Sequence, residues 1–181
     1  MAKMLGFGQP YGVIAQAAYV VADLHKTIDY YTRVLGVGPF FVIEHAKNPN
    51  RLYRGKNYPA ETSLGMSFAG HFNIELIQVH DDSPSVFREG IERQGYGFHH
   101  YGIPFEDVEA SLPSFLEQGF VEVARNPVPT GGEVVFLDPP HPVHPGYIEM
   151  LPVTPKMDET FTRFFEAARD WDGSDPVRPF A

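Results

Sequence analysis

Four polar residues lie within apolar, strand-like segments of this sequence, where a side chain able to do chemistry stands out. They are Gln16, Glu75, His100 and Glu149. Both glutamates have apolar neighbours on either side, in the segments NIELIQ and YIEML. A carboxylate buried alone in such a strand would cost much free energy, so each needs a partner. A divalent metal ion bound by all four residues would supply that partner.

The types of these ligands limit which metal can bind. Two carboxylates, one imidazole and one amide oxygen suit Zn²⁺, Mn²⁺, Ni²⁺, Co²⁺ or Fe²⁺ and select weakly among them. The chain has no cysteine, so thiolate metal sites, disulfides and cysteine nucleophiles are excluded. Four protein ligands leave room for water on a five- or six-coordinate ion, which is typical of a catalytic metal site rather than a closed structural one.

The four residues occupy matching places in two similar stretches of the chain. QAAYVVADLHKTIDYY and HYGIPFEDVEASLPSF each contain a strand, an Asp and an amphipathic helix. Aligning Gln16 with His100 places Asp23 on Asp107 without a gap. Because side chains alternate faces along a strand, Gln16 should share a face with Ala18, and His100 with Gly102. A duplicated unit of this kind can place its two halves around a pseudo-twofold axis.

The hydrophobic pattern predicts strands and helices in the same order in both halves. Strands are expected at residues 14–21, 40–44, 62–68, 72–79, 98–105, 120–125, 133–137 and 147–151. Helices are expected at 24–34, with Asp23 as N-cap, within 83–94, at 108–117 and at 157–171. The expected fold class is α+β, with paired βαβββ modules forming a cupped mixed sheet around the metal site. Its parts are an N-terminal extension (1–13), a first module (14–97), a second module (98–153) and a C-terminal helical tail (154–181).

Residues 14–152 resemble the vicinal oxygen chelate superfamily of glyoxalases, bleomycin-resistance proteins and extradiol dioxygenases. QAAYVVADLHKTIDYYTRVLGVGPF is similar to the opening module of glyoxalase I and methylmalonyl-CoA epimerase. HHYGIPFEDV and GYIEML resemble the ligand-bearing strands of their second module, and IELIQ resembles the last strand of the first. The set Gln16, Glu75, His100 and Glu149 matches the zinc type of glyoxalase I, so Zn²⁺ is the first expectation. The epimerases and the nickel type usually begin with His instead.

The resemblance implies an enzyme whose metal binds adjacent substrate oxygens and stabilises an enolate. A ligand carboxylate then moves the proton, so Glu149 and Glu75 are the expected catalytic bases. The residues that hold glutathione in glyoxalase I do not carry over, because Val20, Val79 and Tyr96 stand where Arg, Asn and Arg would be. We therefore expect an isomerase, epimerase or lyase acting on another small carbonyl or acyl compound.

Two other functions stay open within the same superfamily. An extradiol-type ring-cleaving dioxygenase would need two histidines and one carboxylate on iron, but Gln16 stands where one His would be. A non-catalytic, bleomycin-resistance-like binding protein would lack the four matched polar residues. His99 should point to the opposite face from His100, or to the strand edge, in a structural or supporting role. His141 and His144 lie in a proline-rich loop that either lines the pocket mouth and relays protons or is a stiff solvent loop.

Charge and composition exclude several classes of partner. The net charge of −9, from 14 basic and 23 acidic residues, argues against nucleic-acid binding. No stretch approaches the roughly 20 apolar residues of a membrane helix, and the N-terminus lacks a signal-peptide pattern, so the expected location is the cytoplasm. A basic run from Lys47 to Lys56 is interpreted as a solvated polar loop, with contact to an anionic substrate as the alternative. We expect a small-molecule substrate and a homodimer.

Overall fold

The structure is a computed structural model that describes residues 3–140 and 146–181. Within those ranges the chain forms one mixed sheet of eleven strands and four helices. The strands are β1 (Gln16–Val20), β2 (Phe40–Ala46), β3 (Leu52–Tyr53), β4 (Lys56–Asn57), β5 (Thr62–Ala69), β6 (Phe72–Val79), β7 (Gly97–Phe105), β8 (Val121–Pro127), β9 (Glu133–Asp138), β10 (Tyr147–Pro152) and β11 (Val177–Pro179). The helices are α1 (Leu24–Arg33), α2 (Val86–Gln94), α3 (Val108–Glu117) and α4 (Pro155–Arg169).

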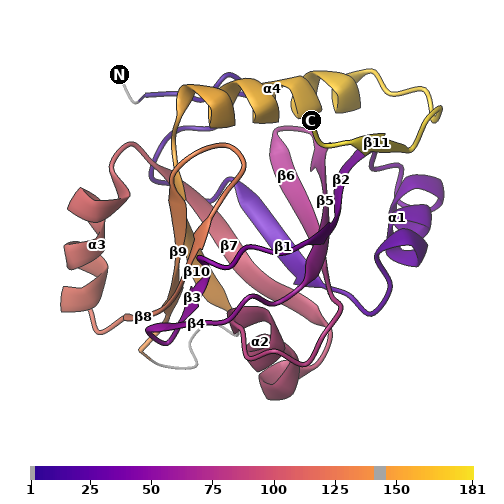
Figure 1. The fold of residues 1–181 in the computed structure, drawn as a ribbon. Coiled ribbons are helices and arrows are strands. Elements are labelled where there is room, and N and C mark those ends of the chain that lie inside the picture. The colour runs from indigo at the N-terminus through magenta and orange to yellow at the C-terminus, as the bar shows by residue number, and fades with distance from the viewer. Residues whose placement is uncertain (1–2, 141–145) are drawn as a thin grey trace.

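The sheet repeats one arrangement of strands on either side of its centre. Its order runs β2-β5-β6-β1 and then β7-β10-β9-β8, with short strands added at both edges. In each half the first strand pairs parallel with the last, and β1 joins β7 in an antiparallel pair. The sheet curves into a cup, with α1 and α3 outside it on opposite sides (Figure 1). The predicted α+β fold, built from two βαβββ units, is therefore confirmed.

Both crossover helices begin where the aligned aspartates predict. The side chain of Asp23 accepts a hydrogen bond from the backbone N–H of Lys26, and that of Asp107 accepts one from Ala110. Such N-caps satisfy amide groups that have no partner within the helix. Each helix then buries its apolar face against the outer side of its own half of the sheet, through separate clusters around Leu24 and around residue 108.

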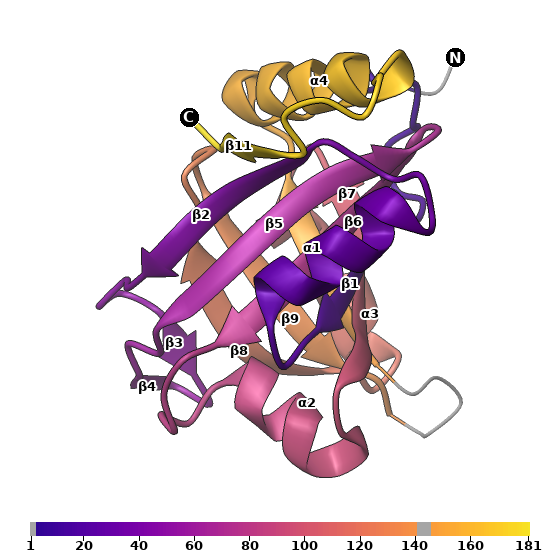
Figure 2. The ribbon, with the colours of Figure 1, turned by 90° about the vertical axis from the view of Figure 1, so that its right-hand side faces the viewer.

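The segment between β2 and β5 contains more structure than the polar loop expected there. β3 and β4 form a small hairpin, whose turn residues Arg54 and Gly55 have φ values of 48° and 74°. Positive φ at both central residues is what a tight type I′ turn requires. β3 also pairs with β8, so this insertion in the first half extends the edge of the second half. The insertion thereby runs from β2, near one edge of the curved sheet, to β8, near the other edge (Figure 2).

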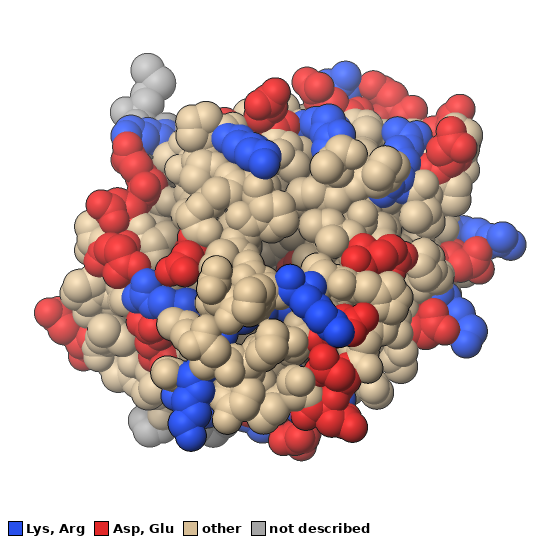
Figure 3. Space-filling view, in the orientation of Figure 1, with Lys and Arg blue, Asp and Glu red and all other residues tan. Residues whose placement is uncertain are grey.

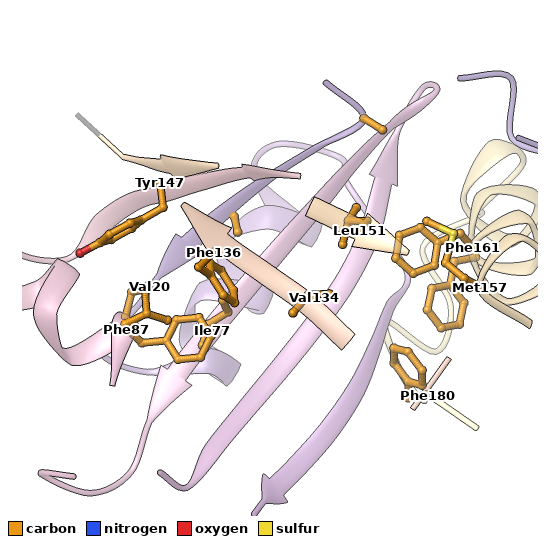
Figure 4. Packing of buried hydrophobic residues seen from close by; sticks show 14 of the residues in the cluster. Val20, Ile77, Phe87, Val134, Phe136, Tyr147, Leu151, Met157, Phe161 and Phe180 are labelled. Carbon is orange, nitrogen blue, oxygen red and sulfur yellow. The ribbon is translucent and has the colours of Figure 1, made fainter. Parts of the chain in front are cut away.

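Both ends of the chain cover one end of the cup. The ring of Phe164 on α4 is fully buried and stacks on Phe41 with 4.0 Å between centroids. The N-terminal segment packs beside it, since Phe7 contacts Phe161 and is fully buried. β11 pairs parallel with β2, so the C-terminal tail also adds a strand to the sheet. Figure 4 shows the apolar interior between Phe136 and this helical cover.

Candidate metal centre

All four predicted ligands lie on the inner face of the sheet, near the join between its halves. In one row across the sheet Glu75 and His100 flank Ala18, and in the next row Gly102 stands between Gln16 and Glu149. Gln16 and His100 are fully buried, and each glutamate is 6% exposed. The four come from β1, β6, β7 and β10 of a single chain.

Three of these side chains converge closely. The Nε2 atom of His100 lies 3.1 Å from Oε2 of Glu149 and 3.5 Å from Oε2 of Glu75. One ligand atom from each of the three lies within 4.8 Å of the others. Among the described residues, this is the one group of three or more His, Asp and Glu side chains arranged in that way. Two carboxylates and one imidazole nitrogen are suitable ligands for a first-row divalent metal.

Gln16 offers its amide oxygen as a further ligand because a chain of hydrogen bonds fixes its orientation. The Asn73 side-chain amide donates to the backbone carbonyl of Ser67 at 3.1 Å, so Asn73 Oδ1 is free to accept. Nε2 of Gln16 donates to that oxygen at 2.9 Å. Oε1 of Gln16 is then left buried without a hydrogen-bond partner among the described residues. A buried acceptor in this state is costly, and a bound cation would satisfy it.

A second chain of hydrogen bonds fixes the tautomer of His100. Nε2 of His99 lies 3.1 Å from the carbonyl oxygen of Val86, which can accept but not donate, so the proton of a neutral His99 is on Nε2. Nδ1 of His99 must then accept from Nδ1 of His100, 2.8 Å away. A neutral His100 consequently presents the lone pair of Nε2 to the two glutamates. This is the form in which imidazole binds a metal.

The prediction for the direction of His99 is wrong. Ala18 pairs with His100 but the next residue, Tyr19, pairs with Phe98, so β7 has an extra residue at position 99. A β-bulge of this kind breaks the alternation of faces. His99 and His100 therefore both point inward and are buried, while the ring of Phe98 turns outward onto Tyr19. The expected supporting role beside the ligand is consistent with this geometry.

Two small residues, Gly102 and Ala18, leave room for the four candidate ligand side chains to lie close together. A Cβ atom added at Gly102 would lie 2.3 Å from Oε1 of Gln16, far inside any van der Waals contact. Ala18 stands between Glu75 and His100 in the same way. The small residues two positions after Gln16 and His100 thus have a steric cause.

The electrostatics of the cluster favour a cation at its centre. Burial, together with the charge of Glu149, raises the pKa of Glu75 above its usual range. Burial alone would lower the pKa of His100, but the charge and hydrogen bond of Glu149, with Glu75 assisting, raise it to about 9. Burial and the neighbouring His100 lower the pKa of His99 to about 3, which keeps that ring neutral. The protein alone thus holds a proton where a metal ion would supply more positive charge.

A cavity of about 140 Å³ opens beside the cluster, and both Glu75 and Glu149 line it. Its walls are mainly apolar and come from both halves of the sheet and from α4. Phe87, Ile77, Phe136, Val134 and Leu151 are among the lining residues (Figure 4). The cavity gives the candidate metal centre a site for a small, largely apolar molecule.

The three positions discussed for glutathione binding differ in their surroundings. Val20 is buried in the main apolar cluster, Val79 packs against that cluster, and Tyr96 is 58% exposed.

His141 and His144 lie outside the residues that the structure describes. Acidic and basic side chains are interspersed over the face shown in Figure 3. Within the described ranges, no helix has both the length and the apolar character needed to cross a bilayer.

Residues 15–136 match the model of the Glyoxalase/Bleomycin resistance protein/Dioxygenase superfamily. The chain belongs to this superfamily. The sequence resemblance is thereby confirmed for the family, and the convergent glutamates and histidine lie where its two modules meet. No curated protein matches this sequence.

Solved structures with this superfamily's fold include two methylmalonyl-CoA epimerases. The one from Mycobacterium tuberculosis is 20% identical with a TM-score of 0.57, and the match covers 88% of this chain and 96% of that chain. A variant from Streptomyces coelicolor, in complex with 2-nitronate-propionyl-CoA, is 18% identical with a TM-score of 0.55 and coverages of 78% and 94%. A mutant of 4-hydroxymandelate synthase from Streptomyces coelicolor is 17% identical with a TM-score of 0.56, covering 80% of this chain and 39% of that chain. Identities of this size show a common fold.

Proposed function

We propose that this protein is a metal-dependent isomerase, epimerase or lyase that forms an enolate of a small carbonyl or acyl substrate and does not use glutathione. The observation that carries the proposal is the buried, unpartnered amide oxygen of Gln16 beside Glu75, His100 and Glu149. These four donors would hold the metal, with Zn²⁺ as the first expectation and Ni²⁺, Co²⁺, Mn²⁺ or Fe²⁺ as alternatives.

A divalent ion bound there would polarise adjacent oxygens of the substrate and so lower the pKa of its carbon acid. The protein's own part is to move the proton. Glu75 and Glu149 line the cavity from opposite halves of the sheet, so a substrate in the cavity would have a carboxylate on either side. The raised pKa of Glu75 suits a group that must both accept and return a proton. One glutamate removing the proton and the other returning it would isomerise or epimerise the substrate.

The first test is metal content and solvent exchange. Elemental analysis of the purified protein should find about one divalent ion per chain, and the Glu149→Ala and His100→Ala variants should lose it. Nuclear magnetic resonance in D₂O should then show exchange of the α-hydrogen in at least one of a panel of ketones, 2-oxo acids and acyl thioesters. A metal-free wild-type protein, or metal with no exchange in any panel member, would refute the proposal.

The same measurements separate the two alternatives. A ring-cleaving dioxygenase would contain iron and consume oxygen with a catechol. Among the described residues its usual pair of histidines has no counterpart, because both ring nitrogens of His99, the histidine beside His100, are engaged by His100 and Val86. A non-catalytic binding protein would retain the apolar cavity and bind a ligand equally well with and without metal. In that case the affinity of the Glu149→Ala variant for the ligand would be unchanged.

A further inference from the structure

The guanidinium group of Arg51 is a charged group that the proposed chemistry does not use. Arg51 lies just before β3, in the insertion that crosses between the rims of the cup, and it lines the same cavity as Glu75 and Glu149. Its Nη1 atom donates to the carbonyl oxygen of Ala60 at 2.6 Å and to Oγ1 of Thr62 at 3.1 Å. These two bonds hold the guanidinium in a fixed orientation.

The other edge of this guanidinium has no partner among the described residues. Nε is buried without a hydrogen bond, and no hydrogen bond of Nη2 is found. No described carboxylate lies within the 4.0 Å of an ion pair, including Glu75 and Glu149. The charge of Asp81 acts on Arg51 from farther away, but the oxygens of Asp81 accept the backbone N–H groups of residues 61 and 83. Burial lowers the pKa of Arg51, yet a guanidinium stays charged in proteins.

The other basic residues of the same run behave differently. Lys47 pairs with Glu61, Arg54 pairs with Glu89, and Lys56 lies on exposed β4. The expectation of a solvated polar loop therefore fits these three residues but not Arg51. A charged fork that is partly buried, fixed and unpaired has a high desolvation cost unless an anion completes it.

We propose that Arg51 binds a carboxylate at one end of the substrate while the reacting carbonyl lies at the metal centre. The inference rests on the proposed function and adds the class of substrate: a small oxo acid or acyl acid with an apolar body. Nη2 can donate to one oxygen of a carboxylate, and the buried, unpartnered Nε on the same edge can donate to the other as the carboxylate displaces the atoms that cover it. Arg51 is the sole Lys or Arg among the described residues that line the cavity, which fits a single negative charge better than a phosphate dianion.

The test compares charged and neutral forms of one ligand by isothermal titration calorimetry. The probes are levulinate and benzoylpropionate, each a ketone with a carboxylate at its far end, beside their amides and phosphonates. The wild-type protein should bind each carboxylate about 10- to 100-fold more tightly than its amide, as expected for charge-assisted hydrogen bonds. The Arg51→Met variant should lose this preference, and Arg51→Lys should keep a smaller one because it retains the charge but not the fork.

The matched control is Lys56→Met, which removes the same charge from the neighbouring hairpin and should leave the preference intact. Thermal unfolding and metal content of each variant show whether it is folded. A carboxylate preference that survives Arg51→Met, tighter binding of the phosphonates than of the carboxylates, or no saturable binding of either acid would overturn the inference. The titrations are repeated on chelator-treated protein and on Glu149→Ala, because the preference due to Arg51 should persist there even if the metal chemistry is refuted.

Discussion

The two halves of the sheet build the candidate metal centre from equivalent positions but support it differently. Each half supplies one glutamate from its last strand and one neutral donor from its first strand. In the first half the donor is the Gln16 amide, held by Asn73 and the backbone of β5. In the second half it is the His100 imidazole, held by His99 and the backbone of α2. Each chain of hydrogen bonds ends on a backbone carbonyl oxygen, which can accept a hydrogen bond but cannot donate one.

The two donors differ in how they respond to pH. An amide has no proton to lose near neutral pH, so Gln16 can fill a coordination position without responding to pH. An imidazole titrates, so a metal ion bound at His100 would have to displace the proton that its raised pKa favours. The candidate ligands thus lie at equivalent places in the two halves, whereas the bulge in β7 turns a histidine inward beside the donor of the second half.

Removing the donor of each half should have unequal effects, and this is the largest effect we expect. His100→Ala should weaken Zn²⁺ binding by more than about 100-fold, beyond the range found for residues that only support a ligand. Gln16→Ala should weaken it by about 10-fold, because a neutral amide oxygen contributes less to the site. Competition with a chromophoric chelator measures both affinities. Equal losses in the two variants would remove the distinction between the halves.

Removing the residue that holds each donor, His99 or Asn73, should weaken Zn²⁺ binding less than removing the donor itself. The loss should again be larger in the second half. His99→Leu leaves the Nδ1 proton of His100 without an acceptor, and we expect about 10- to 100-fold weaker Zn²⁺ binding. His99→Asn, which can still accept near the position of Nδ1, should recover part of it. Asn73→Ala frees the Gln16 amide to turn over and should cost about 10-fold or less. If His99→Leu binds Zn²⁺ like the wild-type protein, the tautomer argument fails.

The sequence predicts where the four candidate ligands lie because alternation along strands is a local property. Gln16, Glu75, His100 and Glu149 were recognisable as polar residues in apolar strands, and the structure brings all four to one face. The aspartate N-caps were equally local, since they depend on the residue that begins each helix.

The supports were not predictable in the same way because they depend on irregular or distant contacts. A single inserted residue in β7 reverses the expected direction of His99, and a period of two does not reveal a bulge. Arg51 belongs to a polar run whose other members are solvated, so only the path of the insertion across the cup distinguishes it. Asn73 did carry a signal, as a second polar residue two positions before Glu75 and therefore on the same face.

Filling the space beside Gln16 should disturb the donor of the first half from a position in the second, where the added atom would also meet Leu151 at 2.9 Å. Gly102→Ala places a methyl group 2.3 Å from Oε1 of Gln16, and we expect a loss of about 1–3 kcal/mol in the free energy of unfolding with weakened metal binding. Gly65→Ala is the matched control, because its nearest contact is a side-chain atom at 3.3 Å and it lies away from the centre. Chemical denaturation measures both variants. A tolerated Gly102→Ala with full metal content would show that Gln16 is not held where the structure places it.

Titration of the metal-free protein should reveal chiefly His100 of the second half, with a contribution of the same sign from Glu75, whose pKa is also raised. The pKa of His100 is raised to about 9 in the folded state from an ordinary value of 6.5, so the folded state binds more protons between these values. Stability from this group is present below about pH 6.5 and is lost as the pH rises through about 9, by about 3 kcal/mol. Urea denaturation across this range should show that loss in the wild-type protein and in Gln16→Ala, and a smaller loss in His100→Gln, which keeps Glu75. Saturating Zn²⁺ should flatten the profile, because the metal replaces the proton on Nε2. A pH profile that is the same in His100→Gln as in the wild-type protein would mean that another group carries the titration.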